Sequence, residues 1–583
     1  MFWGKSRVKH ILSGWRMASL GVLASIGLVT GGAGFAAWDL SAPVEETEPG
    51  IPVTSQLVIA KCGSCHAPDD KGNLSRISWE RATPEGWSQA IKRMVRLNGL
   101  QITPAEAKSV VKYLSARHGL APEEAKPVMY LPEHRTIDET NIPNEGIRTA
   151  CASCHSFAQP MSWRRSKADW QLLQKLHVAL YSQAEAQYRR EYPGEAPGPD
   201  GSPAKRPGEI ALEYMSKNAP LHTPEWAAWQ GRMRTPRLAG RWLVSAWVPG
   251  KGRYTGTLDI GAGPVEDEFT TTTALRSVTD GSVLTRSGTG VVYAGYSWRG
   301  RSKGAGAAAP DALTSEARET LWFSPDQATA QGRWFWGEYQ EFGIDVKLVR
   351  STGPTIAAVS VDHLKAGTKG AQLQLLGDGL PAGITPAAVD LGEGVTVKRI
   401  VSQSPTALVV EVDVAAKAIS GMRDVSVAGA VLEKAFPVYH QVDYLKVTPE
   451  TSIARLGSES HPKGYQQFEA IGFENGPDGK PRTADDLALG PIDVTWSMEE
   501  FMSVYYDDDV KFVGQLGPSA LFDPAADGPN PQRRFGRNNY GEVWAVATAK
   551  NEKDKFGKPL TGRSYLVVSV PSYLRWDQPE VSQ

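Results

Sequence analysis

Two five-residue segments hold all four cysteines of the chain, and each of them ends in a histidine. They read Cys62-Gly63-Ser64-Cys65-His66 and Cys151-Ala152-Ser153-Cys154-His155. The two thiols of such a segment can form thioethers to the two vinyl groups of one porphyrin, and the next residue then places its imidazole against the iron. The spacing therefore predicts two covalently attached c-type haems, with His66 and His155 as proximal iron ligands.

Other uses of paired cysteines fit this sequence less well. A thioredoxin-like site would lie in a βαβ pattern, and a zinc site would need both pairs within one small unit. The pairs are instead 89 residues apart (62 to 151), and each has its own histidine. Four cysteines in a chain of this length also exclude a disulfide scaffold.

Two amphipathic segments, one after each motif, offer the sixth iron ligands. Residues 85–97 and 168–180 have helical patterning, with a tryptophan seven residues before Met94 in the first and seven residues before His177 in the second. Two helical turns place both members of each pair on one face, so the segments are predicted to be an internal repeat. We therefore expect Met94 at the first haem iron and His177 at the second, since both residue types ligate haem iron.

Simpler interpretations of these two residues stay open. Met94 could belong to a hydrophobic core, and His177 could be a surface histidine. Other residues could also be ligands: Met129, Met161, Met215, Met233, His118, His134 and His222. Met161 follows His155 by only six residues, which is a short connection to the other haem face. His118 would end a helix over 103–117, where a cationic side chain suits the helix dipole.

The predicted ligand sets indicate electron transfer. With both axial positions of each iron filled, neither haem would keep a site for oxygen or peroxide. His/Met ligation raises the reduction potential and bis-His ligation generally lowers it, so two unequal one-electron sites are expected. We expect no catalytic residue on this chain.

The first residues are predicted to be an export signal. A basic start is followed by an uncharged stretch over 17–38, and small residues near Ala36 suit cleavage. Residues 1–37 are therefore expected to be a signal peptide and the mature chain to be periplasmic. The alternative is an uncleaved anchor, although five glycines in this stretch make a poor spanning helix.

The fold class predicted for the whole chain is multidomain, with a mainly α part followed by all-β parts. The predicted domains are a mainly α dihaem cytochrome c domain (51–238, in modules 51–120 and 135–238), an antiparallel β-barrel (239–352), an immunoglobulin-like β domain (353–443) and a C-terminal β domain (444–583). Aromatic-rich alternating segments indicate the strands of the barrel, one of them over 290–298.

Outside the haem motifs the sequence offers no strong catalytic or binding pattern. The loop 475–486 is rich in oxygen ligands that could bind calcium, but its spacing matches no recognised loop, and a solvated turn is favoured. Asp507, Asp508 and Asp509 are likewise expected to form a solvated edge. The formal net charge of −1 gives no sign of a nucleic-acid partner, and no nucleophile elbow, P-loop or dinucleotide motif occurs.

The chain resembles the α subunit of quinohaemoprotein amine dehydrogenase. The likeness rests on the export signal, on the three β domains in a chain of 583 residues, and on the haem modules with Cys62, Cys65, His66, Met94, Cys151, Cys154, His155 and His177. In that family an αβγ heterotrimer oxidises primary amines to aldehydes and ammonia. The β subunit is a propeller, and the small γ subunit carries a cysteine tryptophylquinone.

The resemblance implies that this chain is the dihaem electron-transfer subunit of an amine dehydrogenase, an oxidoreductase whose amine chemistry lies on the γ subunit. Electrons would pass from the quinone through two haems c to a soluble cytochrome c or copper protein, with no membrane partner after signal cleavage. The alternative is a generic exported dihaem cytochrome c that serves another periplasmic dehydrogenase. A non-enzymatic sensor or adhesion protein is a third class. A dihaem peroxidase is a fourth, and it would need an open iron position.

Overall fold

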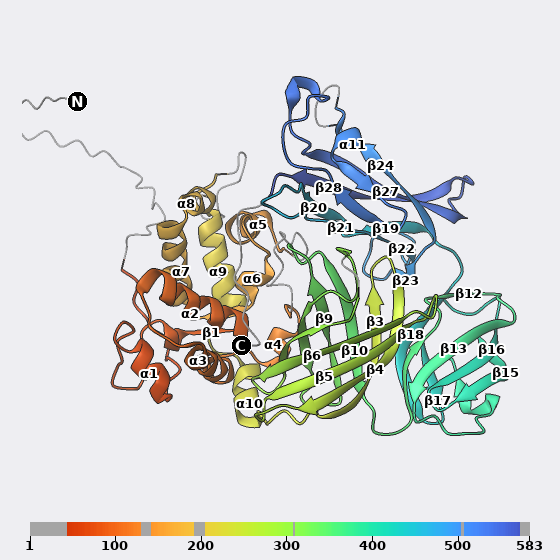
Figure 1. Ribbon diagram of the computed structural model, residues 1–583, viewed down its shortest axis with the longest axis horizontal. Coiled ribbons are helices and arrows are strands. Elements are labelled where there is room, and N and C mark those ends of the chain that lie inside the picture. Colours follow the sequence, from red (N-terminus) through yellow and green to blue (C-terminus); the bar gives the residue numbers. More distant parts are fainter. Residues whose placement is uncertain (1–42, 130–141, 192–203, 307–308, 503–506, 572–583) are drawn as a thin grey trace, which may run out of the picture.

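A helical domain, a closed β-barrel and two further β domains follow one another along the chain (Figure 1). This computed structural model describes residues 43–129, 142–191, 204–306, 309–502 and 507–571. The predicted fold class, α-helical first and then mainly antiparallel β, is confirmed. The predicted signal peptide and His134 lie outside the described residues. Within them, no helix combines the length and the apolar character needed to cross a membrane.

The helical domain contains the same four elements twice, in the same order. The first set is α1 (Gln56–Cys62), β1 (Glu80–Ala82), α2 (Pro84–Asn98) and α3 (Pro104–Arg117). The second set is α5 (Glu145–Cys151), β2 (Trp163–Arg165), α7 (Lys167–Leu180) and α9 (Pro207–Asn218). The expected internal repeat is therefore present in the fold. The domain has four further helices, of which α10 leads to the barrel: α4 (Pro122–Ala125), α6 (Ala158–Met161), α8 (Ser182–Tyr188) and α10 (Pro224–Arg232).

Local sequence signals explain where the two long ligand-bearing helices begin. The Thr83 hydroxyl accepts from the Gly86 amide at the start of α2, where Pro84 occupies the first helical turn. The Ser166 hydroxyl accepts from the Asp169 amide at the start of α7. Equivalent caps thus fix equivalent starting points, and each helix runs past its candidate ligand before it ends.

The two modules are joined by a short antiparallel ladder. Strands β1 and β2 pair with Glu80 opposite Arg165 and with Arg81 opposite Arg164. Apolar side chains from both modules share one core, which includes Trp87, Trp163 and Trp170. The modules therefore form one domain rather than two separate ones.

An eight-stranded antiparallel barrel follows the helical domain. Its strands are β3 (Gly240–Val248), β4 (Gly252–Ala262), β5 (Glu268–Ser277), β6 (Val283–Tyr293), β7 (Ser297–Lys303), β8 (Ala317–Phe323), β9 (Thr329–Trp336) and β10 (Phe342–Arg350). Closure by pairing of β10 with β3 leaves no free sheet edge. Large side chains, Trp242, Trp298 and Trp334 among them, fill the interior, so this barrel is a packed core.

One of the strands predicted for the barrel is wrong. The segment 290–298 is not a single strand, because Ala294 and Gly295 have φ values of 52° and 78° and turn the chain between β6 and β7. The left-handed backbone at both residues makes this a tight hairpin.

Two four-stranded sheets form the third domain. One contains β11 (Thr355–Val359), β13 (Ala371–Asp378), β16 (Ala407–Val414) and β15 (Val395–Ser404), and the other β12 (Leu364–Lys365), β18 (Ala430–Tyr439), β17 (Gly421–Val427) and β14 (Val389–Asp390). Their inner faces enclose one apolar core, as expected of a sandwich. Pairing is antiparallel except between β12 and β18.

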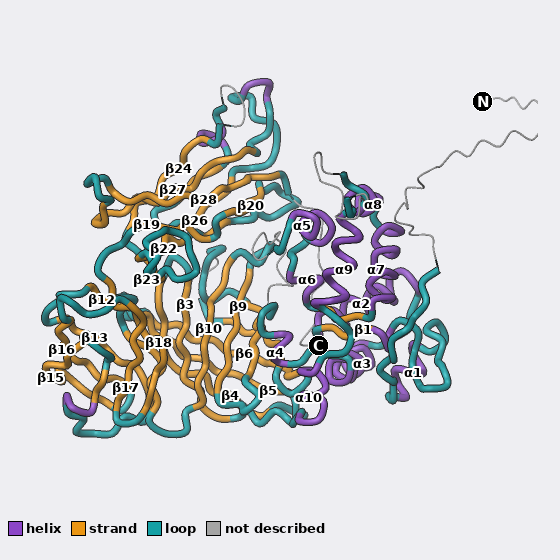
Figure 2. Tube along the Cα trace, turned by 180° about the vertical axis from the view of Figure 1, so that it is seen from behind, coloured by secondary structure: helices purple, strands orange, loops and turns teal. Residues whose placement is uncertain are grey.

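The C-terminal domain lies above the barrel in Figure 1 and on the same side of the molecule in the reverse view of Figure 2. Its largest sheet has β20 (Thr451–Arg455), β28 (Pro559–Ser569), β27 (Gly541–Lys553) and β24 (Val494–Glu500). Two three-stranded sheets accompany it, with β19 (Tyr444–Thr448), β22 (Glu469–Glu474) and β23 (Leu487–Pro491), and with β21 (Gln466–Gln467), β26 (Leu521–Pro524) and β25 (Gly514–Leu516). The short helix α11 (Asp509–Phe512) lies at its far end.

The barrel is docked on the helical domain through buried polar contacts. Arg299 of β7 forms an ion pair with Glu85 in the first turn of α2, with Nη2 to Oε2 at 3.0 Å, and both side chains are buried. The Tyr296 hydroxyl donates to the carbonyl of Leu120 at 3.0 Å, and Trp322 Nε1 donates to the carbonyl of Pro122 at 2.8 Å. The barrel therefore holds the first module, including the helix that carries Met94, in a fixed position.

Candidate haem sites

Both attachment motifs occupy the same position in the repeat. Cys62 is the last residue of α1, and Cys151 is the last residue of α5. The second cysteine of each motif, Cys65 or Cys154, is exposed, and all four thiols are free of disulfides. A free thiol pair next to a histidine at the end of a helix is the donor set that a c-type haem requires, so these residues fit the group.

The proximal histidines are oriented by backbone carbonyls. His66 Nδ1 lies 2.8 Å from the carbonyl oxygen of Ser75, and His155 Nδ1 lies 3.1 Å from that of Ser156. Because a carbonyl only accepts, Nδ1 carries the proton in both rings, and Nε2 keeps its lone pair for a metal. This is the tautomer expected of a proximal haem ligand.

The predicted sixth ligand of the first site, Met94, lies in the last part of α2. Its side chain is half-buried, and its sulfur accepts a weak hydrogen bond from Asn98 Nδ2 at 3.6 Å. Next to it, Val95 and Leu97 are 43% and 62% exposed. Met94 is thus not sealed within a core, and its sulfur lies on a helix turn with apolar neighbours.

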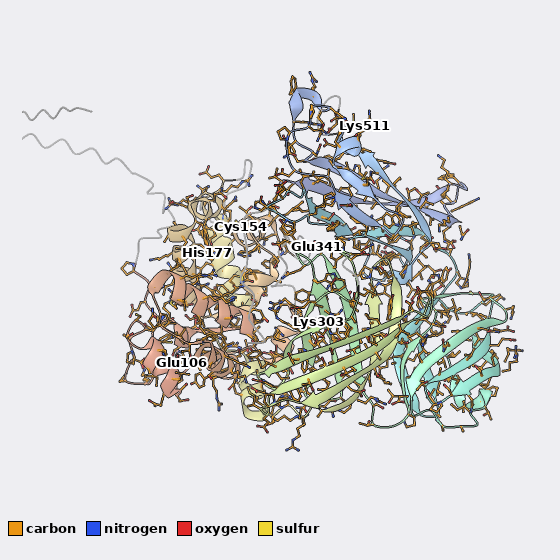
Figure 3. All side chains as sticks on the ribbon, viewed as in Figure 1. Glu106, Cys154, His177, Lys303, Glu341 and Lys511 are labelled. Atoms are coloured by element: carbon orange, nitrogen blue, oxygen red, sulfur yellow. The ribbon has the colours of Figure 1, made fainter. Side chains whose placement is uncertain are left out.

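The predicted sixth ligand of the second site, His177, lies in α7 and is largely buried. Its Nδ1 is 2.9 Å from the carbonyl of Leu173, one turn earlier in the helix, so Nε2 is again left for a metal. Burial lowers the pKa of His177, and burial together with the charge of His177 lowers the pKa of His155 to about 4. Both imidazoles are therefore uncharged near pH 7, which is the form that binds iron. Figure 3 shows His177 and Cys154 in the same helical region.

Tyr188 belongs to the second site, although no pattern in the sequence predicts this. Its ring lies 6.5 Å from that of His177, centroid to centroid, and its side chain is buried. Burial raises the pKa of the phenol, and the nearby thiols of Cys151 and Cys154 add to the effect. Tyr188 thus contacts the region between the attachment motif and the candidate ligand. Only the fold brings it there, because α8 turns back over α5 and α7.

A group of buried charges lies between the modules, beside the second site. Arg165 forms ion pairs with Glu80 and Asp169, and Arg76 Nε contacts Asp169 Oδ1 at 2.6 Å. The charge of Arg165 also contributes to the lowered pKa of His177. These opposite charges compensate one another, so the cluster stiffens the interface without a large net charge.

The remaining histidine and methionine candidates occupy other environments. His118 is fully buried, and burial lowers its pKa to about 4. His118 does end α3 as its C-terminal cap, but the expectation that it is a cation there is wrong, because its side chain lies in the core next to Trp87. His222 Nε2 lies 2.7 Å from the carbonyl of Pro49. The methionines lie in apolar contacts or at a turn: Met161 and Met215 in the helical core, Met233 against the Trp229 cluster, and Met129 at a residue with φ of 24°.

The expectation of a solvated edge at Asp507–Asp509 is also wrong. The side chains of Asp507 and Asp509 are 1% and 5% exposed. Arg533 and Arg537 reach all three carboxylates, with Arg537 Nη2 at 2.7 Å from Asp508 Oδ1. The three carboxylates lie close enough to hold an ion, but two guanidinium groups already balance most of their charge.

The loop 475–486 is tied together by its own side chains. Asp486 accepts hydrogen bonds from the amides of Gly476 and Thr483 and from the hydroxyl of Tyr444, at 3.0, 2.9 and 2.7 Å. The carboxylate oxygens of Asp486 are thus used within the turn. The hydrogen bonds within the loop agree with the turn that the sequence favoured over a calcium site.

Fold and site together define a haem-binding chain with a helical N-terminal domain and three β domains. Four family models match it in consecutive segments: "Quinohemoprotein amine dehydrogenase A, alpha subunit, haem binding" over 53–191, and the alpha-subunit domains II, III and IV of the same enzyme over 235–351, 353–440 and 445–581. The chain belongs to the family of quinohaemoprotein amine dehydrogenase α subunits. The resemblance inferred from the sequence is confirmed.

Other comparisons add little. No curated protein sequence matches this chain. A de novo designed fluorescence-activating β-barrel is 17% identical with a TM-score of 0.15, over 19% of this chain and 93% of that one. Human protocadherin-24 EC1-2 is 13% identical with a TM-score of 0.15, over 39% of this chain and 99% of that one. These scores are too low to relate the folds.

Proposed function

We propose that this chain is the dihaem electron-transfer subunit of a periplasmic amine dehydrogenase. It would take electrons from a quinone on a partner subunit that oxidises primary amines to aldehyde and ammonia. It would deliver them, through two covalently bound haems c, to a soluble cytochrome c or copper protein.

The observation that carries this proposal is the repeat of one complete site. In each module a thiol pair ends a helix, and the histidine that follows it has its Nδ1 bonded to a carbonyl. In each module, too, a buried tryptophan lies seven residues before the candidate sixth ligand and donates Nε1 to the end of the third helix. These bonds run from Trp87 to the His118 carbonyl at 2.9 Å and from Trp170 to the Ala219 carbonyl at 3.0 Å.

This arrangement suits electron transfer because it is rigid around each ligand. Haem iron, when bound, supplies a one-electron couple whose potential depends on its axial ligands. The chain's part is to fix those ligands. Backbone carbonyls orient His66, His155 and His177, and the tryptophan anchors hold α2 and α7 in place. A site that changes little between redox states loses little energy in reorganisation.

The different ligand types should give the two haem sites different reduction potentials. Met94 offers a thioether to the first site, and His177 offers an imidazole to the second. A thioether favours the reduced iron, so the first haem would have the higher potential. Two sites of different potential in one domain support a directed, one-electron route from a donor to an acceptor.

We assign the oxidation of amines to a partner subunit. All four cysteines are used by the two attachment motifs, so none remains to build a tryptophylquinone on this chain. The family to which the chain belongs is named as the α subunit of its enzyme, which implies other subunits. The basic and then uncharged stretch before residue 38 supports export to the periplasm and removal of residues 1–37.

Anaerobic reduction by amine tests this proposal. The native complex is purified, a primary amine is added without oxygen, and the haem absorption bands are recorded. Reduction of both haems by amine is the expected result. Reduction by dithionite but by no amine, without a quinone-bearing subunit in the preparation, would overturn the proposal and favour a generic exported dihaem cytochrome.

A further inference from the structure

Arg76 has a strained backbone in the loop that follows the first attachment motif. Its φ is 70° and its ψ is −56°, a region that a bulky residue rarely adopts. The amide of Ile77 donates to the carbonyl of Ser75 at 2.9 Å, so the three residues form a γ-turn of the rare kind with positive φ. An arginine gains nothing locally from this backbone, so a contact elsewhere must hold it.

The γ-turn determines where the carbonyl of Ser75 points. The φ of a residue fixes the orientation of the peptide plane before it, and here that plane contains the Ser75 carbonyl. The carbonyl oxygen lies 2.8 Å from Nδ1 of His66, the predicted proximal ligand of the first haem. An ordinary negative φ at Arg76 would turn the plane, and the carbonyl would point away from His66. The strained turn is therefore what orients this imidazole.

An ion pair with the other module holds Arg76 in this conformation. Arg76 Nε lies 2.6 Å from Oδ1 of Asp169, whose side chain is 1% exposed. Asp169 lies in the first turn of α7, where its amide donates to the Ser166 hydroxyl and its carboxylate also pairs with Arg165. The partner of Arg76 is thus itself fixed, and it belongs to the helix that carries His177 about two turns further on.

The second module orients its proximal histidine without a comparable turn. His155 Nδ1 lies 3.1 Å from the carbonyl of Ser156, which is the next residue. In this module the histidine and the cap of the ligand-bearing helix are 11 residues apart (155 to 166), whereas they are 17 residues apart in the first module (66 to 83). The longer loop of the first module is the one that an ion pair with the other module holds in place.

We propose that Arg76 is a positioning residue for the first haem, because its ion pair with Asp169 holds the strained turn that aims the Ser75 carbonyl at His66. This inference rests on the proposed function, since it takes His66 to be an iron ligand. A hydrogen bond from Nδ1 to a carbonyl makes the imidazole a stronger donor and favours the oxidised iron. The pair therefore keeps the reduction potential of the first haem low, and it makes that potential depend on the second module.

Two substitutions of Arg76 separate its effect on the backbone from its charge. Arg76→Ala and Arg76→Gly both remove the ion pair, but only glycine adopts a positive φ without strain. In Arg76→Ala the turn should relax, the Ser75 carbonyl should turn away from His66, and the potential of the first haem should rise. In Arg76→Gly the turn can persist, and loss of a nearby positive charge should leave that potential unchanged or lower it. Arg76→Lys can form the ion pair again and should restore the wild-type potential.

The full chain of each variant is produced in the native host, and its complex is purified. Haem per chain is counted from the absorption of the pyridine complex, and the attachment peptides that contain Cys62 and Cys151 are identified by mass spectrometry. A spectroelectrochemical titration then gives the two haem potentials. At a fixed applied potential, the ratio of reduced to oxidised haem in one transition should increase at least about threefold in Arg76→Ala, while the other transition stays in place.

Two results would overturn the positioning proposal. Equal potentials in Arg76→Ala and Arg76→Gly would show that only the charge of Arg76 acts on the haem, or that nothing does. An equal rise of both transitions in Arg76→Ala would show a general loss of structure. If Arg76→Ala does not fold, Arg76→Met takes its place with the same expected rise, because it keeps the length of the side chain without its charge.

The same samples separate this proposal from the proposed function. A wild-type chain without haem at Cys62 would overturn both, because His66 would then not be an iron ligand. Wild-type haems that a primary amine does not reduce, together with the expected rise in Arg76→Ala, would overturn the proposed function alone.

Discussion

Arg81 and Arg164 lie directly opposite each other in the β1–β2 ladder, and both contact the carboxylate of Glu124. Arg81 Nη1 is 2.8 Å from Glu124 Oε2, and Arg164 Nε is 3.3 Å from Oε1. The two arginines also hold the same place in the repeat, since each follows the first residue of its strand and stands two residues before the helix cap. A pseudo-twofold axis therefore passes through this pair of residues.

This symmetry relates the two candidate haem sites. Thr83 and Ser166 are the equivalent caps, and Met94 and His177 follow each of them by eleven residues. The sites are thus placed on either side of one shared centre. Glu124 is not part of the repeat, and it is what allows two buried cations to meet at the axis.

Loss of the Glu124 charge is expected to destabilise this centre strongly. Glu124→Gln leaves two buried guanidinium groups without a counter-ion, which costs about 3–5 kcal/mol of unfolding free energy. Urea denaturation of the holo-protein, followed by fluorescence, measures the change. Glu123→Gln is the control, because Glu123 is 46% exposed where it pairs with Arg232, and its change should stay below about 1 kcal/mol. Equal losses in the two variants would contradict the central role of Glu124.

The carboxyl of Glu124 also makes the stability of the protein depend on pH in the acid range. Burial alone would raise its pKa, but the hydrogen bonds and charge of Arg81 and the charge of Arg164 lower it to about 2, from an ordinary value of 4.5. Its contribution is therefore fully present above about pH 4.5 and is lost as the pH falls toward 2. In Glu124→Gln this part of the acid dependence should be absent.

Replacement of His177 tests whether it sets the potential of the second haem. His177→Met would give that iron a His/Met pair, and its midpoint potential should rise by on the order of 0.1 V. A spectroelectrochemical titration should then show the two haem transitions moving together. His222→Met is the control, because His222 is exposed and bonded to a carbonyl near the surface, and it should leave both potentials unchanged. Unchanged potentials in His177→Met would mean that another residue is the ligand.

The buried ion pair between the barrel and α2 gives a fourth prediction. Arg299→Met leaves Glu85 buried without its partner, which should cost about 3–5 kcal/mol, whereas the double variant Glu85→Met with Arg299→Met should recover most of that loss. Glu85 lies in the first turn of the helix that carries Met94, the proposed sixth ligand of the first haem. The single variant should therefore also weaken the absorption band that a methionine–iron bond would give in the oxidised protein. A weakened band together with unchanged potential of the second haem would place the effect on the first site. A full-strength band would show that the pair stabilises the fold without positioning Met94.

The sequence predicted those features that depend on residues close together in the chain. The attachment motifs and the ligand-bearing helices need only local spacing, and the helix expected over 103–117 is α3, with Thr103 and Glu106 in a capping box. The partners of Asp507–Asp509 could not be predicted in this way. Arg533 and Arg537 follow them by more than twenty residues, and no periodicity connects the two segments.

The other differences between the predicted and the observed structure also arise where local sequence patterns were not sufficient. The turn within 290–298 was missed because β-forming residues surround it, so that Gly295 alone was too weak a signal and Ala294 gave none. His118 was expected to be a cation at the end of its helix, yet it is buried between Trp87 and Tyr113, and burial lowers its pKa. Tyr188 reaches the second site through tertiary folding of α8 alone.

Two part-buried carboxyls between the barrel and the C-terminal domain predict a loss of stability as the pH rises from about 4.5 to 7. Burial raises the pKa of Glu341 and that of Glu469 to about 7, from an ordinary value of 4.5. Glu341 accepts from the amide of Tyr339 at 2.8 Å, and Glu469 accepts from Trp247 Nε1 at 2.8 Å. Figure 3 shows Glu341 at the end of the barrel that faces the upper domain.

Both groups bind protons more tightly in the folded chain than in the unfolded one. Their contribution is therefore fully present below about pH 4.5, falls as the pH rises through 7, and is then lost. Glu341→Gln and Glu469→Gln keep the hydrogen-bond acceptor without the charge, so each should stabilise the protein at pH 8 by up to about 3 kcal/mol. Melting temperatures of wild type and variants between pH 5 and pH 8 check this, with Glu338→Gln as the nearby control. A wild-type melting temperature that does not decrease over this range would show that the carboxyls ionise without cost at this interface.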